Sequence, residues 1–196
     1  MPEIKSVCVY CGSSLGNDPA YAVAAAALGT LIAREGLKLV YGGGKIGLMG
    51  VVSGAALAAG GEVHGVIPHA LALKEIAASD ITEVEVVADM HVRKKRMADL
   101  ADAFITLPGG LGTLEEVAET LTWAQLGWHR KPIGMLDVAG YFDPLLRFLD
   151  AGVTAGFMKA QDRGMLQVSE TPEGILGLLR SYRPPEVKAY LGPSDI

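Results

Sequence analysis

Hydrophobic positions along the chain follow two spacings. Short apolar runs bounded by Gly or Pro predict strands, and longer stretches with apolar residues every three or four positions predict helices. The clearest strands are expected at residues 6–10, 37–41, 63–67, 103–107 and 133–136, with weaker ones at 84–87 and 165–168. Helices are expected at residues 19–34, 48–59, 90–101, 113–126, 142–154 and 172–181.

This alternation of strand and helix is typical of a parallel sheet with helices on both faces. We therefore predict an α/β fold, a single doubly wound, Rossmann-like domain over residues 1–182. The prolines and glycine that follow predict a loosely ordered C-terminal tail over residues 183–196. Residues 70–83 have no convincing period and are expected to form an irregular or mobile segment over the site.

Composition narrows the class of protein. The chain has 196 residues, 50% of them hydrophobic and 20% charged, which suits one packed core and excludes a disordered chain. The net charge is −5 and the basic residues are dispersed, so nucleic acid is not an expected partner. The start lacks the pattern of a secretory signal, and no uncharged stretch reaches the roughly 18 residues of a membrane span. A cytoplasmic protein without a membrane partner is expected.

Cysteine and histidine give no sign of a metal or redox site. Cys8 and Cys11 form a C-x-x-C pattern, but they lie in or beside a predicted strand, where residues three apart point to opposite faces. A disulfide or a zinc pair is therefore not expected. The four histidines have no metal-ligand spacing, so no metal is predicted.

Three glycine-rich turns follow predicted strands, at residues 11–14, 42–47 and 108–113. In an open parallel sheet, ligands bind beyond the carboxyl ends of the strands. Glycine lets the backbone approach a phosphate, and a helix start supplies unpaired N–H groups and a positive dipole end. Together the three turns predict a site for a phosphate-bearing small molecule.

The middle turn matches G-x-G-x-x-G through Gly42, Gly44 and Gly47, which keeps a dinucleotide-dependent oxidoreductase as an alternative. Against it, the turn follows the second strand, and the next strand ends in Pro68 where a ribose-binding acid is expected. Lys45 is not followed by Ser or Thr, so the phosphate-binding pattern of nucleoside triphosphatases is absent. A tight turn without a ligand would also explain these glycines.

Arg93 lies on the apolar face of its predicted helix, with Met90 and Met97. Its charge cannot be removed, so a carboxylate or a phosphate is expected beside it. A structural ion pair between helix and sheet is the alternative to a functional role. Residues 94–96 turn progressively away from this face and are expected to be solvated or to lie at an interface.

Glu116 has two interpretations. With Thr113 it fits a capping box, in which Thr113 bonds forward and Glu116 reaches back to the Thr113 N–H. Leu114 and Leu121 mark the predicted buried face, and Glu116 lies roughly opposite, in line with Trp123. Glu116 is therefore expected to be open to a ligand or a partner subunit. A carboxylate would repel a phosphate at the same helix end, so it should face a sugar.

Two strings resemble the paired signatures of the Lonely Guy family, the cytokinin-activating phosphoribohydrolases. They are Met-His-Val-Arg-Lys at residues 90–94 and Pro-Gly-Gly-Leu-Gly-Thr-Leu-Glu-Glu at residues 108–116. The resemblance extends through residues 11–14, 41–50 and 122–127, and covers the chain to about Tyr182. Many relatives carry the label lysine decarboxylase, but nothing here looks like a pyridoxal phosphate lysine site, and no cofactor is expected.

The resemblance implies hydrolysis of the N-glycosidic bond of cytokinin riboside 5′-monophosphates, and of AMP, to the free base and ribose 5-phosphate. It implies that Arg93 and Glu116 are the catalytic pair. A carboxylate would stabilise the oxocarbenium-like transition state and orient or deprotonate water. Arg93 would keep Glu116 ionised and aimed, or hold a ribose hydroxyl. The implied substrate- and phosphate-binding residues are Gly12, Ser13, Gly43, Gly44, Met90, Lys94, Gly109, Gly110, Gly112 and Thr113.

The resemblance also implies a homodimer with the site near the interface. Because Trp and Arg are favoured interface residues, we expect the two copies to meet through the helices around Arg96 and Trp123. A nucleotide- or cofactor-binding carrier of the same fold, without catalysis, is the alternative function. Such a carrier would keep the glycine turns but would not need Glu116.

Overall fold

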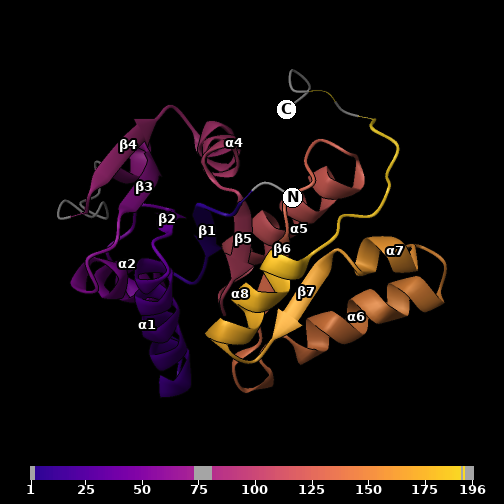
Figure 1. Cartoon of the computed structure of the whole chain (residues 1–196), viewed down its shortest axis with the longest axis horizontal. Helices are drawn as coiled ribbons and strands as arrows, with labels where there is room; N and C mark the ends of the chain where they lie inside the picture. The colour runs from indigo at the N-terminus through magenta and orange to yellow at the C-terminus, as the bar shows by residue number, and fades with distance from the viewer. Residues whose placement is uncertain (1–2, 73–80, 191, 193–196) are drawn as a thin grey trace.

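The computed structural model describes residues 3–72, 81–190 and 192. It contains a seven-stranded sheet in the order β4-β3-β2-β1-β5-β6-β7, in which every neighbouring pair is parallel (Figure 1). The strands are β1 (Ser6–Tyr10), β2 (Lys38–Tyr41), β3 (Val63–Pro68), β4 (Glu83–Val87), β5 (Ala103–Thr106), β6 (Ile133–Leu136) and β7 (Leu166–Ser169). The helices are α1 (Pro19–Arg34), α2 (Gly47–Ala58), α3 (His69–Ala72), α4 (Met90–Leu100), α5 (Leu111–Gln125), η1 (Val138–Gly140), α6 (Asp143–Thr154), α7 (Ala160–Arg163) and α8 (Pro172–Ser181).

These elements confirm the predicted doubly wound α/β fold. Each predicted strand and helix is present, and the largest difference in a boundary is at α5, which begins two residues earlier than expected. The short elements α3, η1 and α7 were not predicted. Residues 70–72 of the segment that was expected to be irregular belong to α3, and residues 73–80 of that segment lie outside the described residues.

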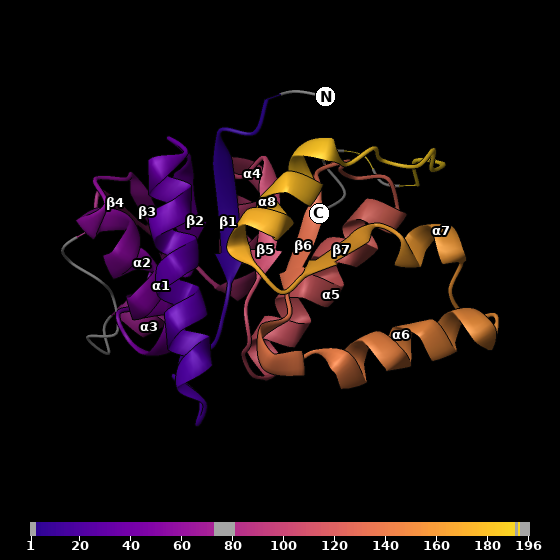
Figure 2. The same ribbon diagram turned by 60° about the horizontal axis from the view of Figure 1, so that its bottom comes forward.

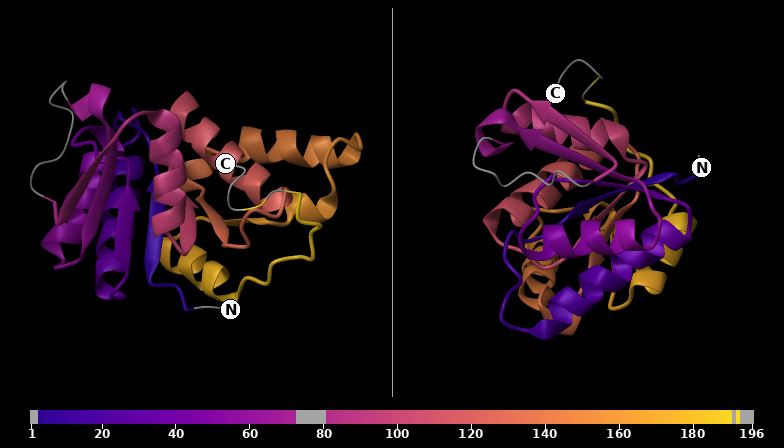
Figure 3. Two further views of the ribbon diagram at one scale, coloured as in Figure 1. Left: turned by 90° about the horizontal axis from the view of Figure 1, so that it is seen from above. Right: turned by 90° about the vertical axis from the view of Figure 1, so that its left-hand side faces the viewer.

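Two hydrophobic clusters lie on opposite faces of the sheet, as alternating side chains of β1 require. Val7 and Val9 belong to the cluster that also contains residues of α1, α2 and α8. Cys8 and Tyr10 belong to the cluster that contains residues of α4 and α5, with α6 packed at its edge. In the left view of Figure 3, α8 lies on the opposite side of the sheet from α4 and α5, and in Figure 2 α1 and α8 stand in front of the strands. Cys8 and Cys11 are free and fall into different clusters, and burial raises the pKa of both thiols.

The chain reverses its direction across the sheet at β1. Strands β2 to β4 follow on one side of β1, and β5 to β7 on the other, so the carboxyl ends of β1 and β5 border the crevice where ligands bind. Beyond these ends, the Gly12 N–H donates to the Pro108 carbonyl at 3.0 Å, and the Leu48 N–H donates to the Gly12 carbonyl at 3.0 Å. The three glycine turns therefore meet at one edge of the sheet.

The segment after α8 contains no helix or strand in its described part, but it contacts the body of the protein. The Tyr190 N–H donates to the Leu126 carbonyl at 2.8 Å, and Val187 packs against the second hydrophobic cluster. This part of the predicted tail is therefore held in place. Within residues 3–72 and 81–190, no helix is long and apolar enough to cross a membrane.

Close packing of α1 on α2 depends on Gly29, because a Cβ at this position would overlap the Val52 carbonyl oxygen. We expect Gly29→Ala to lower the free energy of unfolding by about 1–3 kcal/mol, since the two backbones would have to separate. Gly54→Ala is the matched control, because Gly54 lies in α2 with open space around it, and the change should be neutral or stabilising by up to about 1 kcal/mol. Urea unfolding measures the free energy of unfolding of both variants. Equal stability of the two variants would contradict this account.

Candidate active site

Arg93 is buried where α4 crosses the carboxyl ends of β2 and β3. The residue is 8% exposed, and its Nε donates to the Val66 carbonyl at 3.2 Å. Its Nη2 lies 3.7 Å from Oε1 of Glu116. The buried anion that the sequence required beside Arg93 is therefore Glu116. A separation of 3.7 Å is longer than a direct hydrogen bond, so each group keeps capacity to bind another molecule.

Gly42 makes room for this guanidinium. A Cβ at Gly42 would overlap Nη2 of Arg93, so a larger residue would displace the arginine from its place next to Glu116. Gly42, the first glycine of the G-x-G-x-x-G string, thus provides space for the Arg93 side chain. The presence of glycine at position 42 is therefore explained without a bound dinucleotide.

The structure corrects the predicted role of Glu116 in a capping box. Helix α5 begins at Leu111 with Gly110 as its N-cap, and no side chain caps it. Glu116 is 9% exposed and Leu114 is 42% exposed, so these two residues were placed on the wrong sides of the helix, whereas Leu121 packs against the second hydrophobic cluster as expected. The face turned inward carries the polar residues Thr113, Glu116 and Thr120 together with apolar ones. The hydrophobic pattern missed the inward-facing polar residues because Thr113 and Glu116 line a cavity beside the core.

Burial dominates the titration of Glu116. Loss of solvent raises its pKa to about 7, although the Arg93 charge opposes this shift; Glu115 raises the pKa further and Lys94 lowers it. At neutral pH the carboxyl therefore exists in both protonation states. A carboxyl with this pKa can accept and return a proton at physiological pH.

Lys94 was expected to be solvated or to lie at an interface, but it is buried within the chain. Its side chain is buried, and its ammonium bonds Glu115 and also Glu119, the latter at 3.0 Å. Burial lowers the pKa of Lys94, but the two carboxylates outweigh it and the pKa is raised. The burial of Lys94 was not predicted because both carboxylates lie on α5, more than 20 residues further along the chain. Lys95 and Arg96 are half-exposed and pair with Asp99 and Glu85, respectively.

Arg93 and Glu116 line a cavity of about 320 Å³, which we call the Arg93–Glu116 cavity. Most of the residues that were predicted to bind substrate line it: Gly12, Ser13, Gly44, Met90, Gly110, Gly112 and Thr113. Gly43 and Lys94 are not among its lining residues, since Gly43 packs on Ile67 and Lys94 is held by carboxylates. Apolar side chains that were not predicted to bind substrate also line it, among them Met49, Ile67, Leu71 and Met97.

A second cavity, of about 290 Å³, lies beside the first and shares Gly12, Ser13 and Gly110 with it. Gly109 and Tyr141 line this second space, which we call the Tyr141 cavity. The Gly12 N–H is already bonded to Pro108, whereas Gly110 and Gly112 have open space around them. The start of α5 is therefore the part of this region that a phosphate can approach. Tyr141 follows β6, and applying the strand-end rule to β6 as well would have identified it.

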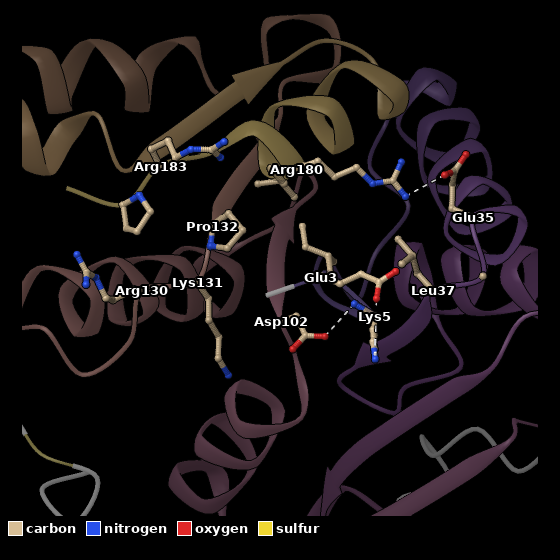
Figure 4. A pocket seen from close by; sticks show the side chains of 14 residues that line it. Glu3, Lys5, Glu35, Leu37, Asp102, Arg130, Lys131, Pro132, Arg180 and Arg183 are labelled. Atoms are coloured by element: carbon tan, nitrogen blue, oxygen red, sulfur yellow. Dashed lines mark hydrogen bonds and ion pairs between the residues drawn. The ribbon is translucent and has the colours of Figure 1, made fainter. Parts of the chain in front are cut away.

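A larger cavity, of about 840 Å³, lies at the opposite edge of the sheet, where the strands begin (Figure 4). Its charged groups already have partners. Glu35 pairs with Arg180 at 2.9 Å, and Asp102 accepts the Lys5 N–H at 2.9 Å. None of the three glycine turns lines this cavity, so the candidate site lies at the other edge.

Comparison with known proteins shows the family to which the chain is related. A family model described as "Possible lysine decarboxylase" matches residues 49–179. A cytokinin riboside 5′-monophosphate phosphoribohydrolase of Arabidopsis thaliana is 49% identical over 182 residues, which cover 93% of this chain and 84% of that protein. One from Oryza sativa subsp. japonica is 47% identical over 182 residues, covering 93% of this chain and 75% of that protein.

Solved structures share the fold at low sequence identity. A molybdenum cofactor binding protein from Rippkaea orientalis has a TM-score of 0.69 and 24% identity, and the match covers 92% of this chain and 98% of that chain. The molybdenum cofactor carrier protein of Chlamydomonas reinhardtii has a TM-score of 0.69 and 21% identity, with 91% and 97% covered. These similarities show the fold alone.

The raised pKa of Glu116 predicts a pH-dependent stability. The folded state keeps the proton of Glu116 up to about pH 7, whereas the unfolded chain loses it near pH 4.5, so stability falls as pH rises between these values. Glu116→Gln lacks this titration. We therefore expect the variant to gain stability relative to the parent from pH 4.5 to 7, by about 1–3 kcal/mol, with no further gain above pH 8. Urea unfolding at several pH values tests this, and a constant difference would refute it.

Proposed function

Because the chain belongs to the family that contains the cytokinin riboside 5′-monophosphate phosphoribohydrolases, we propose that it hydrolyses the N-glycosidic bond of such nucleotides to a free base and ribose 5-phosphate. This membership confirms the resemblance to the Lonely Guy family. The observation that carries the proposal is the buried Arg93–Glu116 pair, which faces a cavity at the edge where the glycine turns meet.

Glu116 is the group we assign to the reacting sugar carbon. Cleavage passes through an oxocarbenium-like state, which a nearby carboxylate stabilises. Its pKa of about 7 also suits it to take a proton from the attacking water at neutral pH. Arg93, at 3.7 Å, favours the ionised form and restricts the direction of the carboxylate.

The start of α5 is the part of the site that we assign to the 5′-phosphate. A Cβ added at Gly110 or Gly112 would meet no atom within 4 Å, and unpaired N–H groups at a helix start attract anions. Ser13, exposed between the two cavities, supplies a hydroxyl. We assign Gly12 and Gly43 to shaping the loops, and Lys94 to holding α4 on α5 through Glu115 and Glu119.

The base fits the apolar side of the Arg93–Glu116 cavity. Met49, Ile67, Leu71 and Met97 line that side, and Met90 stands at its mouth with 41% exposure. Unbranched methionine side chains adapt to ligands of different shape. This surface is suited to a purine with an apolar N6 substituent, and AMP is the simplest nucleotide that it would accept.

A homodimer remains part of the proposal, with a corrected interface. Trp123 is 8% exposed and packs against Trp128 at 5.0 Å between ring centroids, so it is not the surface anchor that the sequence suggested. Exposed apolar residues instead lie at the rim of the Arg93–Glu116 cavity, where Leu111 is 85% exposed. A second copy covering Met90 and Leu111 would remove this apolar surface from water and enclose the site.

The dimer proposal predicts a mass of two chains in light scattering at micromolar concentration. Replacing Leu111 by Asp should shift the protein toward the monomer, because a charge would be buried at the contact. Val23→Asp is the control, since Val23 is exposed on α1, away from the cavity. A fully active monomeric parent would refute the interface.

Phosphate dependence is the main test of the proposed reaction. Binding of a phosphate that does not react can position the sugar, so its loss should reduce both turnover and affinity. We expect kcat/KM for isopentenyladenosine 5′-monophosphate to exceed that for its nucleoside by at least about 100-fold, near 2.7 kcal/mol. Chromatographic detection of the released base measures kcat/KM for the nucleotide and for the nucleoside. Equal rates, or release of no base, would overturn the proposal and leave the carrier alternative.

If Arg93 and Glu116 are catalytic, substitutions of either residue should lower activity while the protein still folds. Glu116→Gln should lower kcat by at least about 100-fold, because an amide can neither carry the negative charge nor accept the proton. Arg93→Lys keeps the charge but loses the planar guanidinium, and kcat should fall by about 10-fold or more. Glu62→Gln, an exposed carboxylate paired with Lys38, is the control and should remain fully active. Turnover within a few-fold of the parent in both site variants would make the pair structural.

A further inference from the structure

Tyr141 reaches from the segment after β6 to the glycine turn after β5. Its hydroxyl donates to the Gly109 carbonyl at 2.5 Å. Among the described residues, this is the one side-chain hydrogen bond to residues 108–112. Together with the Gly12 N–H, which donates to the Pro108 carbonyl, this bond holds the turn that begins α5 from two neighbouring loops.

The direction of this bond determines where the next amide points. A trans peptide is planar, with its C=O and N–H on opposite sides, and the described residues contain no cis peptide. Holding the Gly109 carbonyl on Tyr141 therefore turns the Gly110 N–H away from the tyrosine. Gly110 is the N-cap of α5 and lines both cavities. Its N–H belongs to the unpaired amides that we assign to the phosphate.

The segment that carries Tyr141 is held in an unfavourable conformation. Ala139 has φ 54°, the one positive value among the described non-glycine residues, and a residue held in this region costs about 1–3 kcal/mol. The buried Asp137 accepts the Phe142 N–H at 2.7 Å and closes the turn. The ring of Tyr21 lies edge-on to Tyr141 at 5.6 Å. Such strain persists only where surrounding contacts determine the conformation.

We propose that Tyr141 is a positioning residue, which orients the Gly109–Gly110 peptide so that its N–H can bind the 5′-phosphate of the nucleotide. This inference rests on the proposed phosphoribohydrolase function. Tyr141 acts through the peptide because its single O–H is already donated to Gly109. The loop after β6 thereby becomes part of the phosphate site, although no phosphate-binding motif marks it in the sequence.

The test is Tyr141→Phe, which keeps the ring against Tyr21 and removes only the hydroxyl. We expect KM for AMP and the dissociation constant of ribose 5-phosphate to rise about 3- to 10-fold, the usual effect of one lost hydrogen bond. The inhibition constant of adenine, which carries no phosphate, should not change. Calorimetry with ribose 5-phosphate gives a readout that needs no turnover, and Tyr190→Phe controls for removal of an exposed hydroxyl away from both cavities.

A general structural role for Tyr141 would weaken adenine and ribose 5-phosphate together, and that result would overturn the inference. Unchanged binding of ribose 5-phosphate by Tyr141→Phe would overturn it as well. A parent protein that neither binds ribose 5-phosphate nor cleaves AMP would instead remove the proposed function itself, and the inference with it. Tyr141→Ala should bind ribose 5-phosphate more weakly than Tyr141→Phe, because it also loses the contact with Tyr21.

Discussion

The permanent charge of Arg93 constrains the architecture around the candidate site. A buried guanidinium needs hydrogen-bond acceptors and an opposite charge, since it cannot lose its proton. The Val66 carbonyl supplies one acceptor, Glu116 supplies the charge, and Gly42 supplies the space. Three elements far apart in the sequence, β3, α5 and the turn after β2, are thereby fixed relative to α4. The same constraint holds Glu116 where solvent is scarce, which is the origin of its raised pKa.

The spacing of apolar residues was sufficient to predict the sheet, because each strand is short, apolar and bounded by glycine or proline. Chemistry, rather than spacing, predicted an anion at Arg93. Periodicity did not predict that Glu116 and Lys94 are buried, because the partners that hold them lie on another helix. The pairing of Arg93 with Glu116 was implied by the family resemblance and not by the spacing of residues. Periodicity assumes that a buried face is apolar. On α5 that assumption fails, because Thr113, Glu116 and Thr120 face inward.

The glycines show why a phosphate-binding pattern is ambiguous in sequence alone. A Cβ at Gly47 would overlap the backbone of Ser13, and Gly42 leaves space for Arg93. These two glycines are required by contacts within the protein. Gly110 and Gly112 have open surroundings instead, and no internal contact requires them. All four sit in similar strings, so the pattern could locate the edge of the sheet that holds the site, but not the glycines that a ligand can approach.

Two features at the candidate site lower the stability of the folded protein. Because the pKa of Glu116 is raised to about 7, ionisation of this carboxyl lowers the stability of the folded protein. The positive φ of Ala139 adds backbone strain nearby. Neither feature is needed for the sheet, which is stabilised by two apolar clusters. Departures of this kind are expected where function opposes stability. Glu116 lines the Arg93–Glu116 cavity and Tyr141 lines the adjoining Tyr141 cavity, and Gly110 lines both. Under the proposed function, the two departures would therefore act on different parts of one nucleotide, the carboxyl at the sugar and the tyrosine at the phosphate.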